Sequence, residues 1–365
     1  MTAEPEPGPG PGPGPVSSAT APTLVIGEAI TDVLTGEDGV RRARPGGSPA
    51  NVALGLARLG HPVRLATRIG RDGPGRELRA HLRGSGVVLA PGSQTDDPTS
   101  TATARLDAAG TAHYGFDITW DLPPGALDGP APAHLHTGSL ATALAPGADR
   151  VFAAVEAARA GATVSYDPNI RPALLADPGR ERQRAERFVA LSDVVKASEE
   201  DLGLLRPGHS PDETARRWAE GSREGRGPAL VVVTMGGAGA RVFWPGGRCE
   251  VPATAVEVAD TVGAGDAFMA GLLSGLLHTG LLASAGPSGS PGAARARTAL
   301  REATARARLD PRVGSALWLA ARTAALTCTR EGADPPTRSE LTRWAAGRWP
   351  PGRPPAPGAA GPGPR

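Results

Sequence analysis

Cysteine, lysine and aromatic residues are all scarce in this chain of 365 residues. The two cysteines, Cys249 and Cys328, lie far apart and lack the spacing of metal ligands, which predicts inert thiols. Aromatic residues make up only 4% of the chain, whereas hydrophobic residues make up 40%. Aliphatic side chains and alanine must therefore fill the core.

The sequence also lacks a long apolar run, a visible signal peptide and any block of basic residues. Its formal net charge is +2, which is close to balance. We therefore expect a cytoplasmic protein with no membrane or nucleic-acid partner. Residues 1–22 and 350–365 are rich in proline and glycine and are predicted to be disordered, so the folded domain is expected over residues 23–349.

Several common phosphate-binding and metal-binding motifs are missing. The P-loop needs a lysine after a glycine pattern, and the only lysine, Lys196, follows no such pattern. The protein-kinase motifs His-Arg-Asp and Asp-Phe-Gly do not occur, and neither do His/Cys clusters with metal-ligand spacing. The first apolar run ends at a lone Gly27 instead of Gly-x-Gly-x-x-Gly, which weakens a dinucleotide site.

What the sequence does contain is an alternation of short apolar runs and helical segments. Strands are predicted at 23–28, 63–67, 134–137, 163–167, 193–195 and 229–234, and helices at 52–60, 73–83, 147–160, 181–191 and 313–330. This alternation is typical of βαβ units around a mainly parallel sheet. The last helix is expected to pack beside the element that follows Asp260.

Residues 100–120 interrupt this rhythm. Two short runs flank Asp107-Ala108-Ala109-Gly110, which is a hairpin signal. We interpret the segment as a small β-rich flap on the α/β body. The alternative is an ordinary hairpin within the main sheet.

One glycine-rich stretch, Asp260-Thr261-Val262-Gly263-Ala264-Gly265-Asp266, precedes a dense apolar run of helical length. Small residues permit a tight turn whose N–H groups face a ligand, and the start of a helix adds further donors, so the stretch predicts an anion site. Asp266 either has a functional role in this site or is only the N-cap of the helix. Lys196 is the only lysine, and all other basic residues of this type are arginines. Either it remains by chance, or its position requires a compact ammonium group.

Two motifs carry a resemblance to a known family. Gly46-Gly47-Ser48-Pro49-Ala50-Asn51-Val52-Ala53 and the segment from Asp260 to Phe268 resemble the two signatures of the ribokinase/PfkB carbohydrate kinases, closest to the fructokinase-like branch. The resemblance covers roughly residues 23–349, and the segments 167–172 and 332–333 share it. It implies a ribokinase-like three-layer α/β/α body with a small β-rich lid, mainly from residues 31–45 and 98–120.

The resemblance assigns roles around the reacting groups. Asp266 would be the general base for a sugar hydroxyl, and the N–H groups of Gly263, Ala264 and Gly265 would form an anion hole. The residues that would bind the sugar are Asp32, Gly46, Gly47 and Asn51. Asp32 as a solvated loop acid and Asn51 as a helix-start residue are the plain alternatives. Arg171 would contact a polar end of the substrate or pair with a carboxylate elsewhere.

The resemblance also implies a site for ATP and metal ions. Thr234, Gly236 and Gly239 would surround the phosphates, while Lys196 stands where many relatives have asparagine in an Asn-x-x-Glu motif. Glu199 would act on Mg²⁺ through water. Asp260 and the carbonyl of Val262 match a monovalent-cation site, for example for K⁺.

The expected activity is ATP-dependent phosphorylation of a sugar, most simply fructose or a related ketose. A 2-keto-3-deoxygluconate or nucleoside-type kinase of the same family is the alternative, followed by a non-catalytic sugar-binding relative. His113, Tyr114 and Phe116 of the flap either close over the sugar or pack the flap on the body. The flap also offers a surface for a homodimer.

Overall fold

The structure is a computed structural model that describes residues 22–35, 40–106, 112–174, 177–225, 227–284 and 292–348. The proline- and glycine-rich ends lie outside these residues, apart from Pro22, as do the turn predicted at 107–110 and part of the loop at 280–290. No helix in the described part is both long and apolar enough to span a bilayer.

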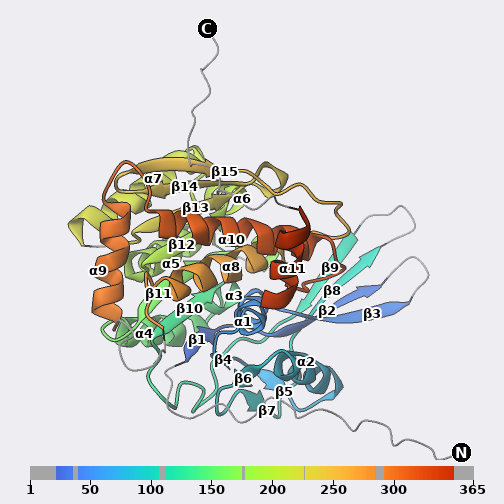
Figure 1. Cartoon of the computed structure of the whole chain (residues 1–365). Coiled ribbons are helices and arrows are strands. Elements are labelled where there is room, and N and C mark those ends of the chain that lie inside the picture. Colours follow the sequence, from blue (N-terminus) through green and yellow to red (C-terminus); the bar gives the residue numbers. More distant parts are fainter. Residues whose placement is uncertain are drawn as a thin grey trace, which may run out of the picture.

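A nine-stranded sheet runs through the described part in the order β15-β14-β13-β12-β11-β10-β1-β4-β6 (Figure 1). Strands β6 to β13 of this order are parallel, and β14 and β15 complete the sheet as an antiparallel edge. The strands are β1 (Thr23–Ile26), β4 (Val63–Ala66), β6 (Val87–Leu89), β10 (His134–Gly138), β11 (Thr163–Asp167), β12 (Val194–Ser198), β13 (Leu230–Thr234), β14 (Ala240–Trp244) and β15 (Gly247–Val251).

Helices cover both faces of this sheet because its strands are apolar on both sides. One core packs Val25 and Leu65 against the first helix layer, and the other packs Leu24 and Ile26 against the second layer. The first layer contains α1 (Ser48–Arg58), α2 (Gly73–Gly84), α8 (Ala264–His278), α9 (Ala293–Thr304) and α10 (Pro311–Cys328). The second layer contains α4 (Gly147–Ala158), α5 (Pro178–Leu191), α6 (Glu199–Leu205) and α7 (Pro211–Glu220). The remaining α-helices are α3 (Leu140–Ala143) and α11 (Arg338–Arg348).

Helix α8 lies at the centre of the first layer, and every residue from Asp266 to Leu277 is buried. It packs directly on α10, as the sequence predicts. A Cβ on Gly271 would lie 2.8 Å from the Cα of Ala320, and a Cβ on Gly275 would lie 2.5 Å from the Cα of Ala316. The two glycines therefore let the helices approach more closely than larger residues would allow.

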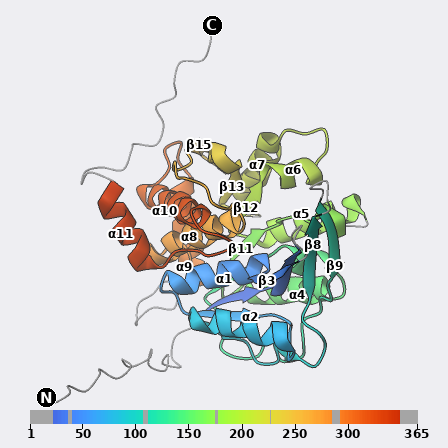
Figure 2. The same ribbon diagram turned by 90° about the vertical axis from the view of Figure 1, so that its right-hand side faces the viewer.

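A second sheet of four strands, in the order β3-β2-β8-β9, stands out from the body (Figures 1 and 2). Its strands are β2 (Ile30–Thr35), β3 (Arg41–Gly46), β8 (Thr101–Leu106) and β9 (Ala112–Asp117), while the short β5 (Ile69–Gly70) and β7 (Gln94–Thr95) pair separately. The predicted lid is thus confirmed, and the alternative of a hairpin within the main sheet is wrong. The sequence analysis did not predict β6, the short β5 and β7, the hairpin of β14 and β15, or the helices α3, α6, α7, α9 and α11.

Candidate active site

The carboxyl ends of the parallel strands meet at one edge of the large sheet, next to the lid. Because all of these strands run in one direction, the segments that follow β1, β10, β11, β12 and β13 converge there. Helices α1 and α8 begin at this edge. The motifs that the sequence singled out are therefore brought together in space.

The turn before α8 has the geometry of an anion site. Gly263 is the N-cap with φ of 75°, and a Cβ there would lie 2.5 Å from the Cβ of Ala333, so glycine is required. The N–H of Ala264 donates to the carbonyl of Thr261 at 3.2 Å. The N–H groups that remain to bind an anion at the start of α8 are therefore expected to be those of Gly263 and Gly265, and not that of Ala264.

Asp266 is the third residue of α8, so its interpretation as an N-cap is wrong. Its carboxylate is buried and accepts hydrogen bonds from the Ser48 Oγ at 2.7 Å, the Asn51 Nδ2 at 2.8 Å and, more weakly, the Asn169 Nδ2 at 3.4 Å. Burial raises the pKa of Asp266 above its usual value, although the bonds from Ser48 and Asn51 oppose that rise. The carboxylate is thus fixed in direction and made more basic by the same environment.

Lys196 lies beside the start of α8. Its Nζ is 2.9 Å from the Asp167 Oδ2 in a buried ion pair, and 3.4 Å from the position of a Cβ on Gly265. Burial would lower the pKa of Lys196, but the carboxylates of Asp167, Asp201 and Asp266 outweigh it and raise that pKa. A charged ammonium at the anion turn favours the need for a compact cation over chance survival.

The residues expected to bind the sugar lie where the lid joins the body. Asp32 is a half-buried residue of β2, so its interpretation as a solvated loop acid is wrong. A Cβ on Gly46 would lie 2.0 Å from the Asp32 Oδ2, and Gly47 has φ of 101°. Asn51 lies inside α1 and bonds to Asp266, so it is not merely a helix-start residue.

Arg171 is exposed and follows β11 by a few residues. Its positive charge lowers the pKa of Asp32, but burial dominates and raises that pKa to about 6. The charge of Arg171 also lowers the pKa values of Glu28 and Asp266, so Arg171 lies within electrostatic range of the site. A contact between Arg171 and a substrate stays a prediction.

The segment after β13 forms a tight glycine loop. Thr234 ends the strand, and Gly236 and Gly239 have φ of 53° and 94°. A Cβ on Gly239 would lie 2.2 Å from the carbonyl oxygen of Val251, so the loop packs against the end of β15. Loops of this kind expose backbone N–H groups to phosphate.

Asp260 is tied into the opposite side of the turn. Its Oδ1 accepts the N–H of Val262 at 3.0 Å, and its Oδ2 accepts the N–H of Gly332 at 2.8 Å. Burial alone would raise the pKa of Asp260, but these backbone bonds outweigh it and lower that pKa. The carboxylate is therefore anionic at neutral pH, as a cation ligand must be.

Comparison with known proteins decides the family. The sequence profile of the pfkB family carbohydrate kinases matches residues 24–339. The chain belongs to this family. It is 38% identical to the fructokinase of Klebsiella pneumoniae over 268 residues, covering 70% of this chain and 85% of that protein. It is 36% identical to the fructokinase of Escherichia coli over 269 residues, which are 72% of this chain and 86% of that protein.

Solved structures agree with the sequence comparison. A fructokinase of Vibrio cholerae O395, a double mutant with bound fructose, ADP and potassium ion, superposes with a TM-score of 0.69 at 28% identity, over 89% of this chain and 98% of that one. The ATP-bound fructokinase of Xylella fastidiosa gives 0.71 at 27% identity with the same coverage. The ribokinase-like fold is thus shown, and this pfkB kinase is a phosphotransferase that acts on a sugar hydroxyl.

Within this pfkB kinase, the structure adds three residues to the site. Ser48 and Asn169 donate to Asp266, and Asp201 joins the segment after β12 to the loop after β11 through its bonds to Ser198 and to the N–H of Ile170. Asn169 has φ of 37°, a strained value that favours a functional position. Both Ser48 and Asn169 stand inside motifs that the sequence analysis quoted, but their partner is distant in the chain.

Glu199 follows β12 directly, and its carboxylate has a partner within the protein. Its carboxylate is half exposed and pairs with Arg241, which also pairs with Asp212. Asp201, two residues later, is the acid of this segment whose charge reaches Lys196. The action of Glu199 on Mg²⁺ stays a prediction.

Proposed function

We propose that this pfkB kinase transfers the γ-phosphate of ATP to a hydroxyl of fructose or a related ketose, with Asp266 as the general base. One observation carries the proposal. The carboxylate of Asp266 is buried, held by Ser48 and Asn51 of α1, and placed on the first turn of α8 next to the Lys196 ammonium. Acid and anion site are thus adjacent but separately held.

The base step follows from this arrangement. A sugar hydroxyl bound beside α1 would give its proton to Asp266 as its oxygen attacks the γ-phosphorus. The raised pKa, caused by burial, makes the carboxylate a better proton acceptor at neutral pH. The hydrogen bonds from Ser48 and Asn51 hold the carboxylate in position for this step.

The phosphoryl group needs positive charge rather than covalent chemistry. The N–H groups of Gly263 and Gly265, the positive end of the α8 dipole and the Lys196 ammonium supply it. Mg²⁺ would neutralise phosphate charge, and it keeps several waters and takes few protein carboxylates. Among the described residues no cluster of three His, Cys, Asp or Glu forms a ready metal cage, so Glu199 would act through water.

A monovalent cation such as K⁺ fits the other side of the turn. Asp260 is anionic there, and its oxygens accept the N–H groups of Val262 and Gly332, whereas a carboxylate offers about four acceptor sites. The carboxylate thus keeps lone pairs for a cation next to the anion turn. The cation would stabilise the turn that presents the phosphate donors.

The sugar site combines Asp32, Asn51 and the backbone of Gly46 and Gly47. Fructose is the proposed substrate because the curated relatives named above are fructokinases and one solved relative contains fructose. Arg171 keeps 2-keto-3-deoxygluconate as the second candidate, since this exposed residue lies within electrostatic range of Asp32 and would pair with an acidic sugar.

A coupled ADP-release assay over fructose, ribose, 2-keto-3-deoxygluconate and nucleosides, with and without K⁺, tests the proposal. In Asp266→Asn we expect fructose binding to persist and turnover to fall by about 10²–10⁴-fold, the usual worth of a positioned base. Asp96→Asn is the matched control, since the Asp96 side chain is 93% exposed and far from this chemistry in the chain. Near-normal turnover of Asp266→Asn would show that Asp266 is not the general base. Sugar binding without turnover in the wild type would favour a non-catalytic sugar-binding protein.

A further inference from the structure

The segment between α10 and α11 has no regular structure, yet it borders the anion turn. The N–H of Gly332 donates to the Asp260 Oδ2 at 2.8 Å. Ala333 packs so tightly on Gly263 that a Cβ on Gly263 would lie 2.8 Å from the Ala333 Cα. The position of residues 332–333 therefore sets the position of the turn.

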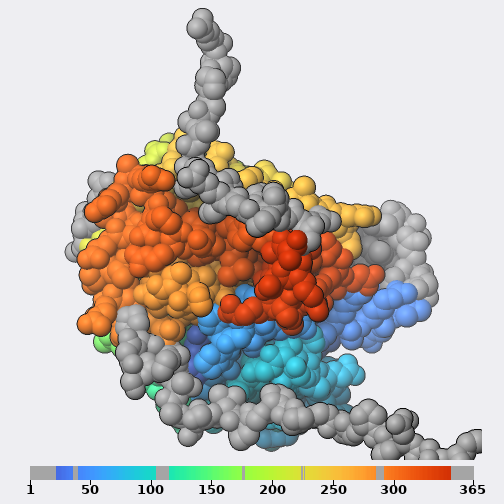
Figure 3. Space-filling view, in the orientation of Figure 1, coloured from blue at the N-terminus to red at the C-terminus, as the bar shows by residue number. Residues whose placement is uncertain are grey.

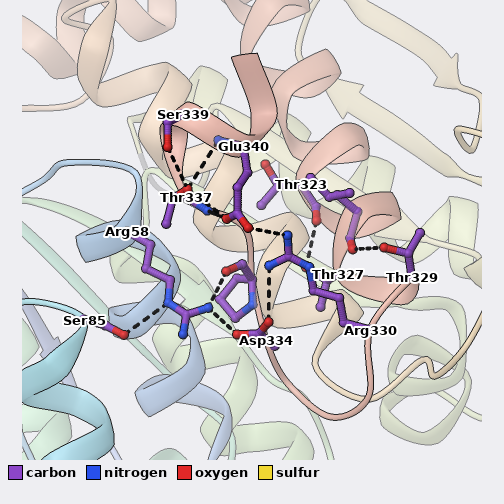
Figure 4. A network of polar contacts seen from close by, with 12 residues as sticks. Arg58, Ser85, Thr323, Thr327, Thr329, Arg330, Asp334, Thr337, Ser339 and Glu340 are labelled. Carbon is purple, nitrogen blue, oxygen red and sulfur yellow. Dashed lines mark hydrogen bonds and ion pairs between the residues drawn. The ribbon is translucent and has the colours of Figure 1, made fainter. Parts of the chain in front are cut away.

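A pair of arginines holds this segment through Asp334 (Figure 4). Arg58, the last residue of α1, donates to the Asp334 Oδ1 and, at 2.6 Å, to the carbonyl of Pro335. Arg330 donates to the Asp334 Oδ2 at 3.2 Å. The Arg58 Nε also donates to the Ser85 Oγ at 3.1 Å, so the guanidinium is anchored on its other side.

The same network has a second half that points away from the turn. Arg330 donates to the Glu340 Oε1 at 2.7 Å, and the Glu340 Oε2 accepts the N–H of Thr337 at 2.7 Å. These bonds fasten the start of α11. Figure 3 shows this C-terminal part of the chain lying against the N-terminal elements, in agreement with the bonds from Arg338 to the carbonyl of Leu59.

Helix α1 thus contacts both the proposed base, Asp266, and the segment that borders the anion turn. Its first turn carries Ser48 and Asn51, which orient Asp266, and its last residue, Arg58, orients Asp334 beside the anion turn. The Arg58 side chain is only 18% exposed, so its contacts are largely shielded from solvent. One helix thus contacts both the Asp266 carboxylate and the segment that packs on the anion turn.

We propose that Arg58 and Asp334 are positioning residues for phosphoryl transfer, which hold Gly332 and Ala333 against the anion turn and so fix the conformation in which the turn presents its N–H groups. The inference rests on the proposed function. Neither residue touches the substrates; both act through Gly332 and Ala333. We call the contacts of Arg58 with Asp334 and Pro335 the clamp. Loss of the clamp should reduce the rate of the chemical step and leave sugar binding largely unchanged.

The test compares Asp334→Asn and Arg58→Lys with Glu340→Gln. Asp334→Asn removes the charge that both arginines contact, and Arg58→Lys cannot bridge Asp334, Pro335 and Ser85 with a planar fork. Glu340→Gln is the matched control, because it weakens the same network on the α11 side only. All three variants are expected to lower the melting temperature.

Steady-state kinetics and calorimetry separate positioning from stability. Since a displacement of about 1 Å can cost about 10²-fold, we expect kcat of Asp334→Asn and Arg58→Lys to fall by about 10- to 100-fold, with the KM for fructose changed by at most about threefold. Titration of ADP plus aluminium fluoride into protein saturated with fructose should show the same loss, whereas ADP alone should bind normally. Glu340→Gln should keep kcat within about twofold of the wild type.

Each outcome decides one question. A normal kcat in Asp334→Asn and Arg58→Lys, or an equal loss in Glu340→Gln, overturns the inference and leaves the proposed function standing. A wild-type protein that phosphorylates none of the sugars overturns the proposed function and the inference with it. If the variants lose affinity for ADP alone, the clamp serves nucleotide binding and not the chemical step. This result also overturns the inference.

Discussion

Lys196 offers the most direct test of how the anion turn works. In Lys196→Met the side chain keeps much of its length and loses its charge. The Nζ lies 3.4 Å from the position of a Cβ on Gly265 and 2.9 Å from Asp167. The substitution therefore removes one positive charge beside the transferred phosphoryl group and leaves one buried carboxylate without its partner.

The expected loss can be worked out from these distances. Two unit charges about 4 Å apart interact by about 4 kcal/mol at an effective dielectric constant of ~20. Asp167 already offsets part of the charge, so we take about 2–4 kcal/mol, or roughly a 30- to 1000-fold lower kcat. Breaking a buried ion pair also lowers the free energy of unfolding by about 3–5 kcal/mol.

The double variant Lys196→Met with Asp167→Asn separates the two effects. It removes the unpaired buried carboxylate, so the stability should recover while kcat stays low. Urea unfolding and a coupled ADP assay, both at a temperature well below the transition, measure the two quantities. If kcat of Lys196→Met stays within about threefold of the wild type, or returns to normal in the double variant, the ammonium has only a structural role.

Two further predictions follow from the geometry of the site. Burial raises the pKa of Asp32 from 3.8 to about 6, so between about pH 4 and pH 6 the folded state holds a proton that the unfolded state has lost, and the contribution of Asp32 to the free energy of unfolding falls as pH rises. Between pH 4 and pH 7 the free energy of unfolding of Asp32→Asn, measured by urea unfolding, should therefore differ from that of the wild type in its change with pH by about 1–2 kcal/mol, and the same change in both proteins would contradict the prediction. Gly263→Ala should lower kcat by at least about tenfold because Ala333 blocks the new Cβ and φ of 75° strains alanine, whereas Gly314→Ala, where a Cβ would meet no atom within 4 Å, should not change kcat.

The sequence predicted those features that are local in the chain. The Gly263–Gly265 turn and the apolar run of α8 each lie within one short segment, so the residues of that segment are enough to predict them. The contact of Ser48 with Asp266 joins residues 218 positions apart, and it depends on how closely α1 approaches α8. A Cβ on Gly55 would lie 2.6 Å from the Cβ of Ala270, so that approach is set by packing and not by any pattern within one segment.

Glu199 shows the other limit of sequence reasoning. Its place after β12 was predicted correctly, but spacing cannot tell which of several acids at a helix start faces the ligand. The structure pairs Glu199 with Arg241, 42 residues later, and turns Asp201 inward instead. Charge alone marks Glu199, Glu200 and Asp201 as equivalent, and only the fold separates them.

The lid links the binding of the sugar to the exclusion of water from the reacting groups. Asp32 belongs to a lid strand, whereas Asn51 belongs to the body. A sugar that bonds to both residues links the lid to the body, so part of its binding free energy goes into restraining the lid. An analogue that lacks the hydroxyl bound by Asp32 should therefore lose more than one hydrogen bond: it also leaves the reacting groups open to water, and ATP hydrolysis then competes with transfer to the sugar.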